Sequence, residues 1–137
     1  MSHVLDLAAG SGEVTLALLG VAPTKVSAID PYTAVAYEQR TGRPCEAMSF
    51  EKIAAGGLRG RTYSLVVCSF AMHLAEPSRL PTLCWELATV AKQLLILTPH
   101  KRPLIQPAWG WTLAQECLHR RVRARLYLSQ ATAKGLS

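Results

Sequence analysis

Residues 6–12, from Asp6 to Gly12, combine an acid with closely spaced glycines directly after a short apolar run. Small residues such as Gly10 and Gly12 let the backbone approach a ligand closely. The free N–H groups at the start of a following helix favour an electron-rich partner. An ordinary strand-to-helix turn would look the same, and a lone Gly-x-Gly favours that alternative. Taken alone, this segment predicts only a turn that can bind a nucleoside.

A second acid, Asp30, ends the next β-branched run of the chain. At the end of a strand, its carboxylate could accept hydrogen bonds from both hydroxyls of a ribose. It could also cap a helix that starts at Pro31, and the two roles can coexist. A dinucleotide site requires a third glycine, but Thr15 stands in its place. Asp6 also suits a ligand that carries an ammonium group, which a dinucleotide turn does not need. The missing third glycine and Asp6 together therefore disfavour a dinucleotide.

His73 follows the most apolar run of the chain and is a candidate general base, because a neutral imidazole titrates near the working pH of most enzymes. Local packing of His73 is the alternative that we favour. Neither the histidines nor the cysteines have the spacing of metal ligands, so the sequence predicts no metal site. The residues concerned are His3, His73, His100, His119, Cys45, Cys68, Cys84 and Cys117.

Short β-like runs alternate with helical segments along the chain. Alternation of this kind predicts an open, mostly parallel sheet with helices on both faces, within one domain over residues 1–137. Ligands of such sheets bind at the carboxyl ends of the strands, where both acids and the glycines fall. The expected strands are 3–7, 25–29, 44–47, 63–70 and 94–98, with a last, half-solvated strand at 122–128. The expected helices are 13–19, 32–40, 50–55, 78–91 and 109–118.

Four stretches of the sequence resemble motifs of class I S-adenosylmethionine-dependent methyltransferases. VLDLAAGSGEVTLAL is similar to their first motif and VSAIDPY to their second. YSLVVCSFAMHL and LLILTPHKRP resemble their fourth-strand and fifth-strand motifs. The resemblance covers roughly residues 3–103, with the motifs in the family's order. It implies a Rossmann-like α/β fold with an antiparallel C-terminal strand, S-adenosyl-L-methionine as cofactor, and methyl transfer to an unidentified acceptor.

The resemblance also implies roles for individual residues. Asp6 would face the methionine amino group, directly or through water, and Asp30 would hold the ribose hydroxyls. One departure is Ala8, where the family usually has glycine. The remaining implied cofactor contacts are Gly10 and Gly12 along methionine and ribose, Ala47 and Met48 beside adenine, and Ser69 and Phe70 beside the methyl group.

The net charge of +6 is local to the C-terminal part of the chain. Residues 1–98 are neutral, whereas residues 99–137 carry seven Lys or Arg and only one acid. His100 and Lys101 could attract an anionic substrate, and Trp109 could stack on a ring, although a solvated loop and a sheet cap explain them equally well or better. Arginines 121, 123 and 125 alternate along the last strand and could contact RNA phosphates. A charged edge strand that resists aggregation is the ordinary explanation.

The thiols are expected to be reduced and mostly buried, which fits a reducing compartment. No leader peptide is visible, and the apolar run 94–97 is too short to cross a bilayer. We expect a soluble cytoplasmic protein, and a nuclear location stays open. Compared with the family, N-terminal cap helices are missing. A catalytically inactive binding or regulatory module that needs a partner, and a homodimer, therefore remain alternatives.

Overall fold

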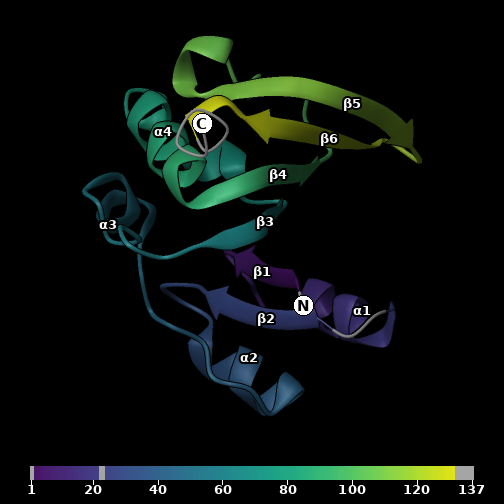
Figure 1. The fold of residues 1–137 in the computed structure, drawn as a ribbon. Helices are drawn as coiled ribbons and strands as arrows, with labels where there is room; N and C mark the ends of the chain where they lie inside the picture. Colours follow the sequence, from purple (N-terminus) through teal and green to yellow (C-terminus); the bar gives the residue numbers. More distant parts are fainter. Residues whose placement is uncertain (1, 22–23, 132–137) are drawn as a thin grey trace.

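A six-stranded sheet of order β2-β1-β3-β4-β6-β5 forms the centre of the fold (Figure 1). The computed structural model describes residues 2–21 and 24–131. The first four strands of that order are parallel, and β6 and β5 are antiparallel to their neighbours. The strands are β1 Ser2–Leu7, β2 Thr24–Ile29, β3 Tyr63–Ser69, β4 Ala91–Thr98, β5 Trp111–His119 and β6 Val122–Ser129. The helices are α1 Glu13–Val21, α2 Ala34–Thr41, α3 Phe50–Ala54 and α4 Leu80–Val90.

Helices cover both faces of the sheet, as the α/β alternation predicts. Figure 1 shows α3 and α4 on one side and α1 on the other. The main core lies on the α4 side, where Leu83 and Leu87 of the helix pack with Leu5 and Leu7 of β1. Side chains alternate along a strand, so Asp6 points to the opposite face, toward α1. The sheet thus holds its one buried acid on β1 apart from the large apolar core.

The predicted helix 109–118 is wrong, because this segment forms the edge strand β5. Ala, Gln, Glu and Leu give it helical propensity, but pairing with β6 from Trp111–Ser129 to His119–Val122 overrides that preference. Trp111 fixes the strand, since its ring is fully buried and its indole N–H donates to the Cys84 carbonyl at 2.8 Å. The C-terminal part therefore contributes two antiparallel strands, where the sequence predicted one.

The prediction that the arginine face of β6 is solvated is wrong at Arg125, which is buried. Arg125 and Tyr127 are buried on the α4 side, whereas Leu128 on the other face is half exposed. Arg125 pairs with Glu116 on β5 and donates to the Pro103 carbonyl at 3.4 Å. Because these partners neutralise and hydrogen-bond the guanidinium, Arg125 cannot serve as an exposed phosphate contact.

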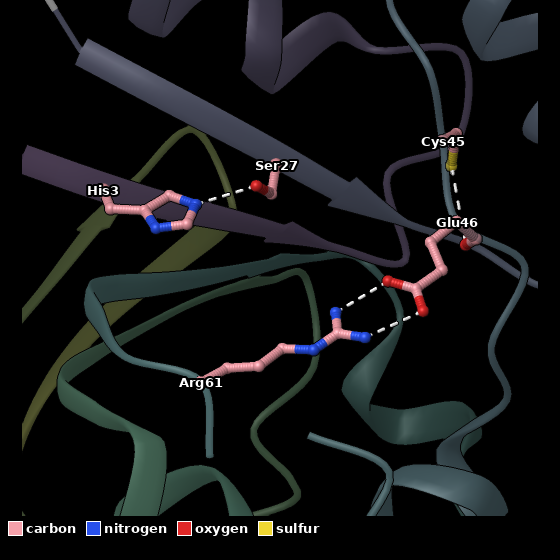
Figure 2. A network of polar contacts seen from close by, with 5 residues as sticks. All are labelled: His3, Ser27, Cys45, Glu46 and Arg61. Atoms are coloured by element: carbon pink, nitrogen blue, oxygen red, sulfur yellow. Dashed lines mark hydrogen bonds and ion pairs between the residues drawn. The ribbon is translucent and has the colours of Figure 1, made fainter. Parts of the chain in front are cut away.

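The segment predicted as a third strand, 44–47, makes a single bridge to β2 at Ile29–Glu46. Glu46 accepts two hydrogen bonds from Arg61, at 2.7 and 2.9 Å, and so joins this segment to the start of β3 (Figure 2). A separate bond of 2.7 Å between the His3 ring and Ser27 links β1 and β2 in the same view. The Glu46–Arg61 pair holds the segment that leads into residues 48–50, which reach the candidate site.

Cys68 and Cys84 are buried free thiols, Cys45 is partly buried and Cys117 is exposed. Burial raises the pKa of Cys68 and of Cys84 to about 12, so both stay protonated and unreactive. Within residues 2–21 and 24–131, no cluster of three or more His, Cys, Asp or Glu could hold a metal ion. No helix in these same ranges has the length and apolarity needed to cross a membrane.

Candidate functional site

The loop between β1 and α1 adopts backbone conformations that suit close approach by a ligand. Gly10 and Gly12 have φ of +60° and +93°, and the Gly12 N–H donates to the Ala9 carbonyl at 3.0 Å. Ala8 also has a positive φ, +57°, which costs a residue with a Cβ about 1–2 kcal/mol. The sequence departs from the family's glycine at this position, where the backbone favours glycine.

Asp30 ties this loop to the end of β2. Its Oδ2 accepts from the Gly10 N–H at 3.1 Å, and its Oδ1 accepts from the N–H groups of Tyr32 and Thr33 at 2.8 and 3.0 Å. Burial acts to raise the pKa of Asp30, but these hydrogen bonds outweigh burial and hold the pKa below its ordinary value. The carboxylate therefore stays ionised, and Oδ2 keeps a lone pair for a further donor.

The turn that Asp30 organises also returns a hydrogen bond to the loop. The Thr33 hydroxyl donates to the Gly10 carbonyl at 2.9 Å. Helix α2 begins one residue later, and its N-cap residue Thr33 makes no side-chain cap bond. Asp30 thus stabilises the turn before α2. The alternative prediction that Asp30 caps a helix starting at Pro31 is wrong, because the helix begins at Ala34 and its N-cap residue is Thr33.

Asp6 lies beneath the loop and is 1% exposed. Burial raises its pKa to about 6, and the nearby acids Glu13 and Asp30 add to the increase. The Thr15 hydroxyl, which donates to Asp6 Oδ2 at 2.7 Å, acts in the opposite direction. Near neutral pH, Asp6 is a mostly ionised carboxylate next to other acids, and this surrounding favours a cation.

A cavity of about 500 Å³ opens at the carboxyl ends of β1, β2 and β3. The size is typical of a small-molecule site. Of the residues that the sequence singled out, it brings together Ala8, Gly10, Asp30, Met48, Ser69 and Phe70.

Three other predicted cofactor residues do not line this cavity. Asp6 is covered by the loop, and Ala47 is exposed to solvent. Gly12 packs against α2, where an added Cβ would lie 2.4 Å from Thr41 Cγ2 and 3.1 Å from Tyr37 Cδ2. The glycine is therefore required by packing of the loop on α2.

Several residues that line the cavity were not predicted from the sequence. Tyr32, Phe50 and Leu74 line it, and Tyr32 and Leu74 are mostly exposed. Arg79 lines it beside Glu76, with 3.6 Å between Arg79 Nε and Glu76 Oε2. Tyr32 lies three residues past the end of β2, so a search extended a few residues past each predicted strand would have found it.

The predicted acceptor residues are more scattered. His73 lies on a short 3₁₀ turn, Met72–Leu74, and its side chain falls outside the described part of the structure. His100 and Lys101 are exposed on the loop after β4 and do not line the cavity. Trp109 borders a second hollow, together with Arg102 and Leu104, and Ala75 lines both hollows.

Comparison of the sequence with known proteins finds a relative of clear similarity. No protein-family model matches the chain. A Schizosaccharomyces pombe protein, the uncharacterized protein C17A5.05c, is 37% identical over 144 positions that cover 80% of this chain. The chain spans 58% of the length of that relative.

Solved structures of low sequence identity share the architecture. A magnesium protoporphyrin IX methyltransferase from Synechocystis, with bound S-adenosylmethionine, has a TM-score of 0.73 at 15% identity, over 93% of this chain and 70% of its own. This chain has the Rossmann-like fold of S-adenosylmethionine-dependent methyltransferases. A methyltransferase from Aquifex aeolicus has a TM-score of 0.66 at 18% identity, over 93% and 81% of the two chains. A TehB-like methyltransferase from Corynebacterium glutamicum has a TM-score of 0.71 at 11% identity, over 93% and 80%.

The methyltransferase fold accounts for the architecture predicted from the four sequence motifs. The predicted mostly parallel sheet, flanking helices and antiparallel C-terminal strand are present, and β5 adds a second antiparallel strand that was not predicted. Since such low identity establishes the fold alone, the ligand and the reaction have to be argued from this chain's own residues.

Proposed function

We propose that this chain binds S-adenosyl-L-methionine in the cavity at the carboxyl ends of β1–β3 and transfers its methyl group to an acceptor. The observation that carries the proposal is Asp30, an ionised carboxylate on the cavity wall that is hydrogen-bonded to the glycine loop through the Gly10 N–H. This arrangement offers an acceptor for ribose hydroxyls beside a backbone that a nucleoside can approach closely.

The other chemical groups of the cofactor also find suitable partners. Asp6, ionised near neutral pH, would attract the methionine ammonium group through the loop or through a water molecule. Met48 and Phe50 give the cavity an apolar wall for the adenine ring. We assign adenine to these two side chains, because Ala47 is exposed and does not line the cavity.

When bound, the sulfonium supplies a methyl group that is already activated for transfer. The protein then has to orient the acceptor and exclude water. Ser69 and Phe70 stand at the end of β3 on the cavity wall, and Phe70 is half exposed. They would border the methyl group and shield it. His73 remains our candidate for accepting a proton from an acceptor group that needs deprotonation.

Replacement of Asp30 tests the cofactor assignment. We expect Asp30→Ala to weaken S-adenosylmethionine binding by roughly 1–3 kcal/mol, since the ribose hydroxyls lose a charged acceptor. Isothermal titration calorimetry measures the change, with thermal unfolding as the check that the variant is folded.

Glu38→Gln on α2 is the matched control. It removes an exposed carboxylate from the helix that follows Asp30 but lies off the cavity wall. Equal affinities of wild type and Asp30→Ala would refute the ribose assignment.

RNA is a second candidate acceptor, supported by a group of cations that we call the basic edge cluster: Lys101, Arg102, Arg120, Arg121 and Arg123. Thr98 at the end of β4 pairs with Arg123, which puts the β5–β6 turn beside the loop that carries Lys101. The Phe70 N–H donates to the Leu97 carbonyl at 2.7 Å, so this end of β4 adjoins the cofactor cavity. Cations at that edge would hold phosphates near the methyl group.

Salt dependence tests this candidate. We expect a labelled single-stranded RNA oligonucleotide to bind with a steep salt dependence, measured by fluorescence anisotropy. Replacing Lys101, Arg121 and Arg123 with alanine should lower the slope by about two to three phosphate contacts. Replacing the exposed cations Arg40, Lys52 and Lys92 is the matched control. A slope unchanged by the first triple variant would remove the RNA candidate and leave a small molecule or a protein as acceptor.

A further inference from the structure

We propose that Thr15 and Tyr37 are positioning residues that hold the Asp6 carboxylate for the cationic end of the cofactor through a buried chain of hydroxyls. The proposal rests on the cofactor assignment above. Asp6 lies on β1, Thr15 on α1 and Tyr37 on α2, so the chain of hydroxyls joins three elements of the fold.

The geometry fixes the direction of the hydrogen bonds. Thr15 Oγ1 lies 2.7 Å from Asp6 Oδ2 and 2.9 Å from the Tyr37 hydroxyl. Thr15 has one proton, and an ionised carboxylate can only accept, so Thr15 donates to Asp6. The Tyr37 hydroxyl must then donate to Thr15. All three side chains are almost completely buried, at 1% exposure or less, so water cannot easily replace either bond.

The surroundings of Asp6 explain why such a chain is needed. The charged groups that act on it are the acids Glu13, on α1, and Asp30, after β2. The thiols Cys68 on β3 and Cys45 also feel its charge. A buried carboxylate among acids is costly without donors, and Thr15 supplies one. The hydroxyl chain therefore keeps Asp6 ionised at the pH at which a cation has to bind.

The chain of hydroxyls runs from Asp6 to α2 and does not include Asp30, whose partners are the N–H groups of Gly10, Tyr32 and Thr33. Tyr37 belongs to α2, which follows the turn that Asp30 organises, and its ring packs where Gly12 lacks a Cβ. Replacing one hydroxyl should thus change the Asp6 end of the site while the Asp30 turn stays in place. A role in packing alone would not depend on the hydroxyl group.

Calorimetric titration with S-adenosylmethionine tests the proposal with nearly isosteric variants. We expect Thr15→Val to weaken binding roughly tenfold, Tyr37→Phe to weaken it by roughly threefold, and Thr15→Ser to restore it to near wild type. Thr89→Val is the matched control, because the Thr89 hydroxyl donates to the Glu86 carbonyl of its own helix, at 2.7 Å, and Thr89 does not line the cavity.

The pH profile separates positioning from packing. Loss of the Thr15 hydroxyl raises the pKa of Asp6, so the affinity of Thr15→Val relative to wild type should fall further at about pH 6 than at about pH 7.5. The ratio cancels the ligand's own titration. A loss that is equal at both pH values, or full binding by Thr15→Val, would overturn the proposal.

The hydroxyl chain can be tested separately from the cofactor assignment. Wild type that binds neither S-adenosylmethionine nor its demethylated product would refute the proposed function. The carboxyl ¹³C resonance of Asp6 then tests the hydroxyl chain directly. A higher pKa of Asp6 in Thr15→Val than in wild type would support the chain, and an equal pKa would refute it.

Discussion

Asp6→Asn is expected to stabilise the protein near neutral pH while it removes most of the cofactor affinity. The pKa of Asp6 is raised to about 6 in the folded protein, mainly by burial. A raised carboxyl pKa gives a stabilising contribution that is complete below the unfolded pKa of 3.8 and is lost as the pH rises through about 6. Above that pH, the wild type therefore carries the cost of a buried charge, and asparagine does not.

The shift of about two pKa units sets an upper limit of about 3 kcal/mol on this gain. We expect a net gain of about 1–2 kcal/mol at about pH 7.5, because the new amide adds donors that are only partly satisfied. Chemical denaturation at about pH 7.5 and about pH 4 measures it, and the gain should be absent at the lower pH.

Binding of S-adenosylmethionine by the same variant should weaken roughly 100-fold, since a buried partner of the ammonium group has been neutralised. Glu13→Gln is the control for loss of a nearby but exposed charge. Asp6→Asn that is less stable than wild type at about pH 7.5, or that binds the cofactor as tightly, would contradict the role given to Asp6.

The largest stability effect is expected at Trp111, which anchors the edge strand β5. Trp111→Ala should lower the free energy of unfolding by about 3–5 kcal/mol, because it empties the site of a fully buried ring. Trp111→Phe should cost less, about 1–3 kcal/mol, since it keeps a ring but leaves the Cys84 carbonyl without its indole donor. Urea denaturation measures both.

Trp85→Ala is the control for Trp111, because Trp85 lies on α4 nearby and is half exposed. Its loss should be clearly smaller. If Trp111→Ala unfolded with less than about 1 kcal/mol of destabilisation, β5 would not be anchored by this side chain.

The parts of the fold that follow from local patterns could be predicted from the sequence. β3 is a short and almost continuously apolar run, as expected of a strand buried on both faces, and α4 places Leu80, Leu83 and Leu87 on one face at helical spacing. β5 could not be predicted, because its residues favour a helix and only pairing with β6 makes it a strand. The burial of Arg125 could not be predicted either, for a similar reason. Alternation shows that two faces differ, but the partner Glu116 decides which face is buried.

The residues of the candidate site also fall into those that could be predicted from the sequence and those that could not. Asp30, Gly10 and Phe70 adjoin strand ends in sequence, so the topology of a parallel sheet was enough to gather them at the cavity. Phe50 and Arg79 reach the cavity through the paths of longer loops, which no local pattern specifies. The inward position of Asp6 follows from strand alternation, but its hydroxyl partner Tyr37, contributed by α2, required the tertiary structure.

Binding of S-adenosylmethionine in the cavity beside Asp30 can be measured by calorimetric titration of the folded wild-type protein. We expect saturable one-to-one binding of S-adenosylmethionine and of its demethylated product, without binding of a nicotinamide dinucleotide. Failure of both sulfur nucleosides to bind a protein that circular dichroism shows to be folded would contradict it.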